Sequence, residues 1–89
     1  MSYTLEINPF TMGTSKDRAL KPLEEAAEAF GAWQLYDYAI NGESYERFAD
    51  EIADCIQACC NLAATYNVDL QAAMERCEKR NRDRGRYES

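Results

Sequence analysis

The residues best suited to chemistry are carboxylates in two short stretches. Glu24, Glu25 and Glu28 stand in KPLEEAAEAFGAW, which after its first two residues is otherwise apolar or small. Glu51 and Asp54 stand in DEIAD. Side chains three residues apart lie side by side on a helix. If both stretches are helical, each therefore presents a pair of carboxylates on one face.

The two acidic pairs can meet if their helices are antiparallel neighbours. Facing carboxylates repel, so such a cluster separates, takes up protons or binds cations. Carboxylate oxygens suit Mg²⁺ or Mn²⁺, and Mg²⁺ keeps coordination positions for phosphate oxygens and water. Either pair alone usually marks a solvated helix face. Two pairs on neighbouring helices, one of them nearly apolar, favour a metal site.

The first half of the chain predicts an arm followed by a helix. Residues 1–13 read as an extended arm, in which YTLEI is a candidate for a short strand. A helix is expected at about 14–40, starting at Thr14, which with Asp17 resembles a capping box. Pro22 either kinks this helix or occupies the first turn of its main part. NGES, residues 41–44, is the expected stop and turn.

The second half predicts two more helices. One spans about 45–66, with an apolar stripe at helical spacing: Phe48, Ile52, Cys55, Cys59, Leu62 and Tyr66. Asp69 is the expected N-cap of another at about 70–82, and a charged tail, 83–89, follows. We therefore predict an all-α fold: residues 1–89 form one domain, an antiparallel bundle of about three helices.

The composition predicts that the bundle is completed by a second chain. With 89 residues the chain buries only roughly 60–65% of its unfolded surface, yet 46% of its residues are hydrophobic. The first helix is apolar most of the way round, which is typical of a helix buried on more than one side. A homodimer or homotetramer is expected.

Charge and hydropathy limit the partners and the compartment. The net charge of −6 argues against a nucleic-acid polymer. No apolar run approaches a membrane span, and the first residues do not resemble a secretory signal. A cytoplasmic protein without a membrane partner is the expectation. Its cysteines, Cys55, Cys59, Cys60 and Cys77, are expected to be reduced, buried thiols rather than an incomplete zinc site.

At this point the sequence resembles a known superfamily. EEAAE at 24–28, then 22 residues, then EIAD at 51–54 is similar to the paired E-E-x-x-E and E-x-x-D motifs of the MazG-like, all-α nucleoside triphosphate pyrophosphohydrolases. RALKPLEEAAE, ADEIADCIQ and CEKRNRDRGRY resemble the family's first-helix, second-helix and C-terminal blocks. The likeness covers about residues 17–87.

The resemblance implies Mg²⁺-dependent hydrolysis of a nucleoside triphosphate to a monophosphate and pyrophosphate, with Mn²⁺ as a substitute. It implies metal ligands at Glu25, Glu28, Glu51 and Asp54. Catalytic roles fall to Glu24, Glu28 and Glu51, where Glu24 orients Lys21 or a water. Four residues are candidates for binding the phosphates, and each could instead be an ordinary polar surface residue: Lys21, Lys79, Asn81 and Arg84. Trp33 and Tyr36 either stack on a base or, more simply, pack in a core or interface.

Two other functions remain open at this stage. Phosphoribosyl-ATP pyrophosphohydrolase belongs to the same superfamily and has similar acidic helices. A non-catalytic helical interaction or regulatory module would keep the fold without turnover. Motif spacing does not separate these alternatives; metal dependence and a substrate panel would.

Overall fold

The structure is a computed structural model that describes residues 1–88. It is all-α, as predicted, with four helices: α1 (Lys16–Ala19), α2 (Lys21–Tyr38), α3 (Gly42–Thr65) and α4 (Leu70–Asp83). No strand occurs between residues 1 and 88, so the strand expected in YTLEI is wrong. That segment is extended but has no strand beside it to pair with.

The first helix starts and breaks at different residues from those predicted. Ser15, not Thr14, caps α1, and its Oγ accepts a hydrogen bond from the Arg18 amide at 3.4 Å. Leu20 separates α1 from α2, and Pro22 lies in the first turn of α2. Of the two alternatives for Pro22, the first-turn position is therefore the one observed. Proline fits there because a first-turn amide has no helical acceptor.

α3 begins three residues earlier than predicted because Asn41 and Ser44 cap its N-terminus. The Asn41 side chain accepts from the Ser44 amide at 2.8 Å, and the Ser44 hydroxyl accepts from the Asn41 amide at 3.2 Å. This reciprocal pair is a capping box. Residues 42–44, predicted as part of the turn, therefore form the first turn of the helix.

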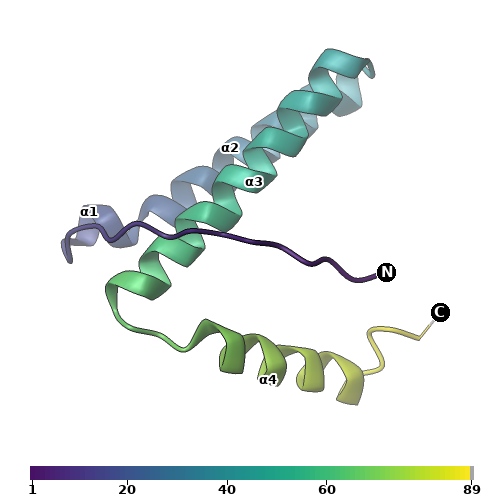
Figure 1. Ribbon diagram of the computed structural model, residues 1–89. Helices are drawn as coiled ribbons and strands as arrows, with labels where there is room; N and C mark the ends of the chain where they lie inside the picture. The colour runs from purple at the N-terminus through teal and green to yellow at the C-terminus, as the bar shows by residue number, and fades with distance from the viewer. Residues whose placement is uncertain (89) are drawn as a thin grey trace.

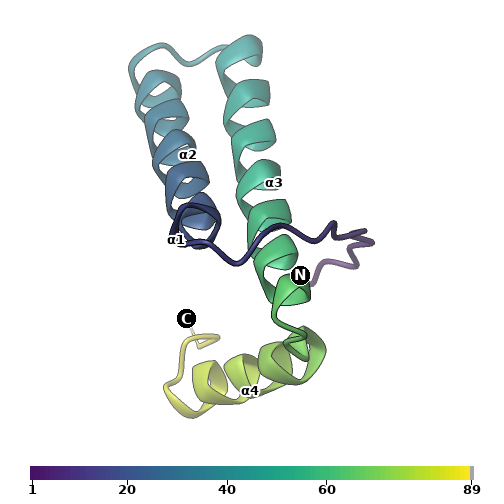
Figure 2. The ribbon, with the colours of Figure 1, turned by 90° about the vertical axis from the view of Figure 1, so that its left-hand side faces the viewer.

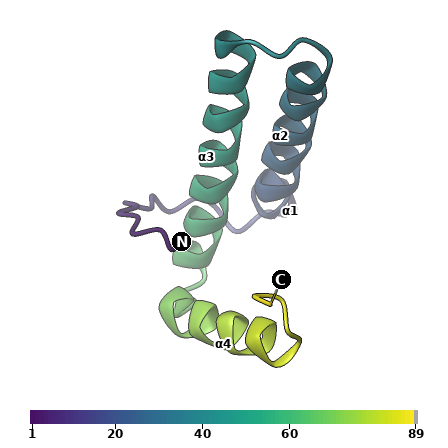
Figure 3. The same ribbon diagram turned by 90° about the vertical axis from the view of Figure 1, so that its right-hand side faces the viewer.

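α2 and α3 form an antiparallel hairpin, and they run side by side in Figures 1, 2 and 3. Near the turn, the Tyr36 ring lies 5.6 Å from that of Tyr45 and 6.1 Å from that of Phe48, centroid to centroid. The alanines Ala32 and Ala58 are the buried apolar residues of the described chain. Small side chains let the two helix backbones approach closely.

α4 does not complete a three-helix bundle within the chain, which corrects that part of the prediction. The chain turns at the C-terminal end of α3, and α4 runs across the direction of the hairpin (Figures 2 and 3). Asn67, in the connecting turn, has a φ of 54°. Asp69 caps α4 as predicted, accepting from the Ala72 amide at 3.0 Å. Beyond α4, Gly85 adopts a φ of 71°, which is typical of a residue that follows a helix.

The N-terminal arm crosses α3 (Figure 1) and is tied to it through polar side chains. The Phe10 amide donates to Asn61 Oδ1 at 3.0 Å, and the Met12 amide donates to Thr65 Oγ1 at 3.0 Å. Gln57 Nε2 donates to the Asn8 carbonyl at 3.1 Å. The arm therefore has a defined path along the helix although it has no regular secondary structure.

The chain exposes more surface than a folded monomer of its size. Its accessible surface is 7321 Å², whereas about 5,300 Å² is typical for a monomer of this mass. Its radius of gyration is 15.3 Å, against about 12 Å for a compact domain of this length. Within residues 1–88, no helix is both long and apolar enough to cross a membrane.

Candidate metal centre

Three carboxylates meet between α2 and α3. Glu25, Glu28 and Glu51 each place one oxygen within 4.8 Å of the other two. The three-residue spacing on α2 aligns Glu25 with Glu28, and the antiparallel hairpin brings Glu51 opposite them. We call these three residues the acidic group. In the described chain it is the one set of three or more potential metal ligands this close together.

Glu51, like Glu25, is a half-buried member of the acidic group, whereas Glu28 is exposed. The Oε2 atom of Glu51 is shielded from solvent without a hydrogen-bond partner among residues 1–88. Loss of solvent raises the pKa of Glu51 most, followed by the negative charges of Glu28 and Asp54. A hydrogen bond with Glu28, available when one of the two carboxyls is protonated, also raises the pKa of Glu51, whereas Arg47 lowers it; the net shift is upward. An enclosed carboxylate oxygen without a donor is suited to a cation.

The pKa of Glu25 is also raised, for similar reasons. Its pKa is raised first by loss of solvent and next by the charge of Glu28, with which its carboxyl can share a proton. The charges of Asp54 and Glu51 raise it further. A positive charge placed beside Glu25 and Glu51 would oppose the rise in their pKa.

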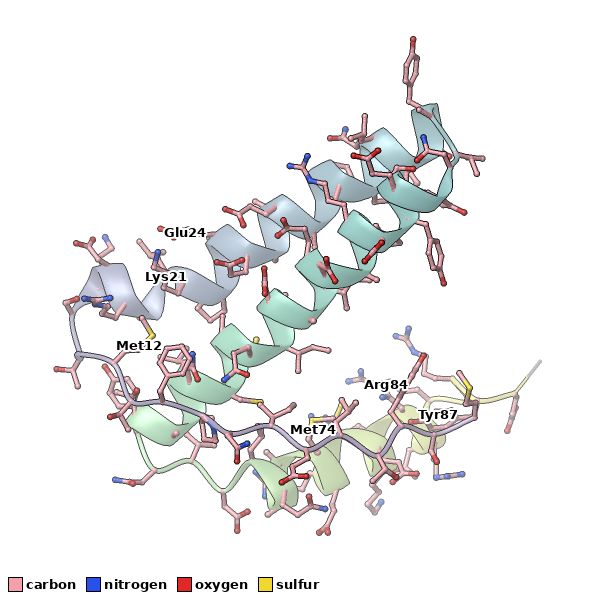
Figure 4. All side chains as sticks on the ribbon, turned by 45° about the horizontal axis from the view of Figure 1, so that its top comes forward. Met12, Lys21, Glu24, Met74, Arg84 and Tyr87 are labelled. Carbon is pink, nitrogen blue, oxygen red and sulfur yellow. The ribbon has the colours of Figure 1, made fainter. Side chains whose placement is uncertain are left out.

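Asp54 interacts electrostatically with the acidic group, whereas Glu24 pairs with a lysine next to it. The charge of Asp54 reaches both Glu25 and Glu51, and Asp54 lines the same cavity as Glu25. Glu24 is exposed and forms an ion pair with Lys21, Oε2 to Nζ, at 3.1 Å. Figure 4 shows Lys21 and Glu24 together at the start of α2. Because Lys21 also lines the cavity, a phosphate placed there would meet a cation next to carboxylates.

The predicted phosphate ligands of the C-terminal block lie elsewhere within one chain. Figure 4 places Arg84 at the opposite end of the molecule from Lys21. Lys79 Nζ pairs with Asp83 at 2.8 Å, and Asn81 Nδ2 lies 3.7 Å from Cys77 Sγ. A single chain therefore does not bring Lys79, Asn81 and Arg84 to the acidic group.

The two aromatic candidates differ in their surroundings. Tyr36 belongs to the aromatic packing near the hairpin turn. Trp33 stays 43% exposed and stacks on Phe30, with ring centroids 5.7 Å apart and planes 17° from parallel. Trp33 and Phe30 therefore form an open apolar surface on α2. Stacking of Trp33 on a base remains a prediction.

The cysteines are all free, but they are less buried than predicted in the single chain. Cys59 is exposed, whereas Cys55, Cys60 and Cys77 are half-buried. Loss of solvent and the neighbouring Cys55 raise the pKa of the Cys59 thiol, so it is a poor thiolate at neutral pH. No three of the cysteines form a ligand set within the described chain.

Sequence reasoning missed two polar residues of α3 that lie near the acidic group. Gln57 and Asn61 line the cavity that also contains Glu25 and Asp54. Asn61 is only 3% exposed, although it is polar. One feature of the sequence could have revealed Asn61: it is an asparagine inside ACCNLAAT, an otherwise small and largely apolar stretch of helix.

No protein-family model matches this chain, and comparisons with curated proteins and with solved structures also find no match. The assignment to the MazG-like superfamily therefore stays a prediction from the acidic motifs and the blocks around them.

Proposed function

We propose that this chain hydrolyses a nucleoside triphosphate to a monophosphate and pyrophosphate with the help of a divalent cation. Glu25, Glu28 and Glu51 would hold Mg²⁺, or Mn²⁺ in its place, with Asp54 beside them. The observation that carries the proposal is the solvent-shielded Glu51 Oε2, which lacks a donor in a group of three converging carboxylates. The donor set fits such a cation, because hard divalent cations prefer carboxylate oxygens.

The chain's own residues would hold the cation, supply positive charge to the phosphates and accept a proton from water. When bound, a divalent cation neutralises phosphate charge and promotes attack of water on phosphorus. Lys21, which lines the cavity together with Glu25, adds a positive charge to the site, and its ammonium group forms an ion pair with Glu24 at 3.1 Å. Glu28 and Glu51 would accept a proton from the attacking water.

We also propose that the working form is a homodimer or homotetramer. The chain exposes about 2,000 Å² more than a typical monomer, whereas a standard interface covers about 800 Å² on each partner. Large apolar side chains on the hairpin, including Leu23 and Phe30, are more than half exposed. A second copy would cover this surface, and its α4 could bring Lys79, Asn81 and Arg84 to the neighbouring acidic group.

The direct test is pyrophosphate release from a panel of ribo- and deoxyribonucleoside triphosphates, standard and modified, with Mg²⁺ or Mn²⁺. Glu51→Gln removes a ligand charge at nearly constant shape and should abolish metal-dependent release. Glu78→Gln on α4 is the matched control, because Glu78 pairs with Arg82 on the surface and should be dispensable.

Each result has a definite reading. Metal-dependent release that Glu51→Gln loses and Glu78→Gln keeps would support the proposal. Release from phosphoribosyl-ATP alone would favour the other enzyme of the superfamily. If the folded protein with excess metal released pyrophosphate from neither, the hydrolase proposal would fail and a non-catalytic module would remain.

A further inference from the structure

A cavity of about 230 Å³ lies between the N-terminal arm and the α2–α3 hairpin, next to the acidic group. The arm contributes Phe10 and Met12 to its walls, and α3 contributes Gln57 and Asn61. Glu25 lines its acidic end. The volume is below the roughly 300–1,000 Å³ of a pocket that encloses a whole ligand. It is therefore suited to one part of a nucleotide, with the rest outside.

Hydrogen bonds fix the orientation of the Asn61 amide. Its Oδ1 accepts from the Phe10 backbone amide at 3.0 Å and from Gln57 Nε2 at 2.8 Å. A backbone N–H can only donate, so the atom facing it must be the oxygen of Asn61. Gln57 is fixed in turn, because its Nε2 also faces the Asn8 carbonyl at 3.1 Å.

These contacts leave the Asn61 amide nitrogen as a spare donor. Nδ2 has no hydrogen-bond acceptor among residues 1–88, although 97% of the residue is covered. Glu51 Oε2 is the one solvent-shielded side-chain polar atom without a partner among residues 1–88, so Asn61 Nδ2 reaches solvent and can be hydrated. Its place in the cavity wall means that a ligand can supply the acceptor. The Asn61 donor is therefore open to a ligand that replaces water in the cavity, and it is separate from the carboxylates.

We propose that this cavity holds the nucleobase of the substrate, an inference that rests on the proposed function. A carbonyl oxygen or unprotonated ring nitrogen of the base would accept a hydrogen bond from Asn61 Nδ2. Phe10 and Met12 supply apolar surface on which a flat ring can pack. The phosphates would then leave the cavity past Lys21 and Glu25, which line its wall, and lie outside it beside the acidic group.

The proposal gives the arm a role in selecting the substrate. Asn61 joins the arm to α3 through its oxygen and faces the ligand through its nitrogen. Loss of the arm contact would therefore disturb the donor, and loss of the donor need not release the arm. Asn61→Asp separates the two roles, because aspartate retains acceptor oxygens for Phe10 and Gln57 but has no amide donor.

The test has two parts. First, the full-length protein is titrated with adenosine, guanosine, cytidine and uridine without metal, while the side-chain NH₂ signals are followed by NMR. The Asn61 pair is identified as the signals missing from Asn61→Asp. Second, kcat/KM is measured for the four ribonucleoside triphosphates with wild type and Asn61→Asp. Thr65→Val is the control, because it removes the Met12 tether and leaves the donor intact.

We expect at least one nucleoside to shift the Asn61 NH₂ signals. We also expect Asn61→Asp to reduce the ratio of kcat/KM between the best and worst base by about tenfold, the effect of a lost hydrogen bond of about 1.4 kcal/mol. Thr65→Val should keep that ratio. A general charge effect of the new carboxylate would lower all four values together and leave the ratio unchanged.

The outcomes separate this inference from the proposed function. Triphosphate turnover with unshifted NH₂ signals, or with an unchanged ratio in a folded Asn61→Asp, would overturn the base pocket and leave the hydrolase standing. If no triphosphate is hydrolysed, the titration alone decides: a shift supports a base pocket, and no shift overturns it. A side chain of a second copy filling the cavity would also give no shift.

Discussion

α4 and the α2–α3 hairpin handle their charges in opposite ways. On α4, Lys79 lies 2.8 Å from Asp83 and Arg82 lies 2.7 Å from Glu78, each pair one helical turn apart. In the hairpin, Glu25, Glu28 and Glu51 converge within 4.8 Å, and the opposing charge of Arg47 does not offset the rise in the pKa of Glu51. Local spacing pairs opposite charges on α4, whereas like charges face one another in the hairpin.

The comparison separates charges that support a helix from charges that suit a ligand. Exposed pairs four residues apart stabilise a helix slightly and need nothing else. Converging carboxylates with a shielded oxygen raise the free energy of the folded state until protons or a cation neutralise them. Such groups are more common at functional sites than in ordinary surface networks.

The largest expected effect comes from placing a positive charge inside the acidic group. Glu28→Lys would give the hairpin its own cation, as α4 has already. We expect the melting temperature of the metal-free protein to rise by several degrees and turnover to fall at least roughly 100-fold, since even outer-shell changes at metal sites cost 10–100-fold. Circular dichroism melting and pyrophosphate release measure the two effects. A variant with wild-type turnover would contradict the proposed metal site.

The next effect is stabilisation by metal. Mn²⁺ or Mg²⁺ should raise the melting temperature of wild type, because a ligand at 100 times its Kd stabilises the folded state by about 2.7 kcal/mol. The same additions should leave Glu51→Gln nearly unchanged and act fully on Glu78→Gln. Differential scanning calorimetry with and without EDTA gives the comparison. Equal shifts in wild type and Glu51→Gln would place metal binding elsewhere.

A smaller effect should appear in the pH dependence of stability without metal. The pKa of Glu25 and of Glu51 is raised above the ordinary 4.5, so the folded state binds more protons than the unfolded chain from pH 4.5 up to the raised values. The contribution of these groups to stability is complete below pH 4.5 and is lost as pH rises through that range. The metal-free melting temperature should fall there, and less so in Glu51→Gln. Metal should help more at higher pH.

The smallest effect is expected on α4. Lys79→Ala breaks the exposed pair with Asp83, which should cost about 0.3–0.5 kcal/mol. Urea denaturation would measure this loss. The KM for the triphosphate should also be measured with this variant. An unchanged KM would mean that Lys79 stabilises α4 and does not bind the substrate. A clear rise in KM would instead support delivery of α4 to the site of a second copy.

The sequence was most informative where local chemistry decides the structure. The cap at Asp69, the first-turn position open to Pro22 and the helical spacing of Glu25 and Glu28 depend on a few neighbouring residues. Convergence with Glu51 also follows, because a short turn between two helices makes them antiparallel neighbours. The direction of α4 did not follow, since it depends on the backbone at Asn67.

Asn61 could not be assigned a role from its position alone. Its partner in the arm is the Phe10 amide, 51 residues away in sequence. An asparagine in a helix is ordinarily a surface residue or a break in the pattern. Its burial and its spare donor are visible only when the arm is in place, so tertiary structure had to supply both.

The way the arm is tied down also sets an order of folding. Its tethers join residues 51 and 53 positions apart, whereas the α2–α3 hairpin forms between neighbours in sequence. Closing a longer loop costs more entropy, so the hairpin should form first and the arm should settle onto it last. The Phe10 and Met12 amides should then exchange with deuterated water sooner than those of the hairpin. A bound nucleotide would slow that exchange, since it favours the settled arm.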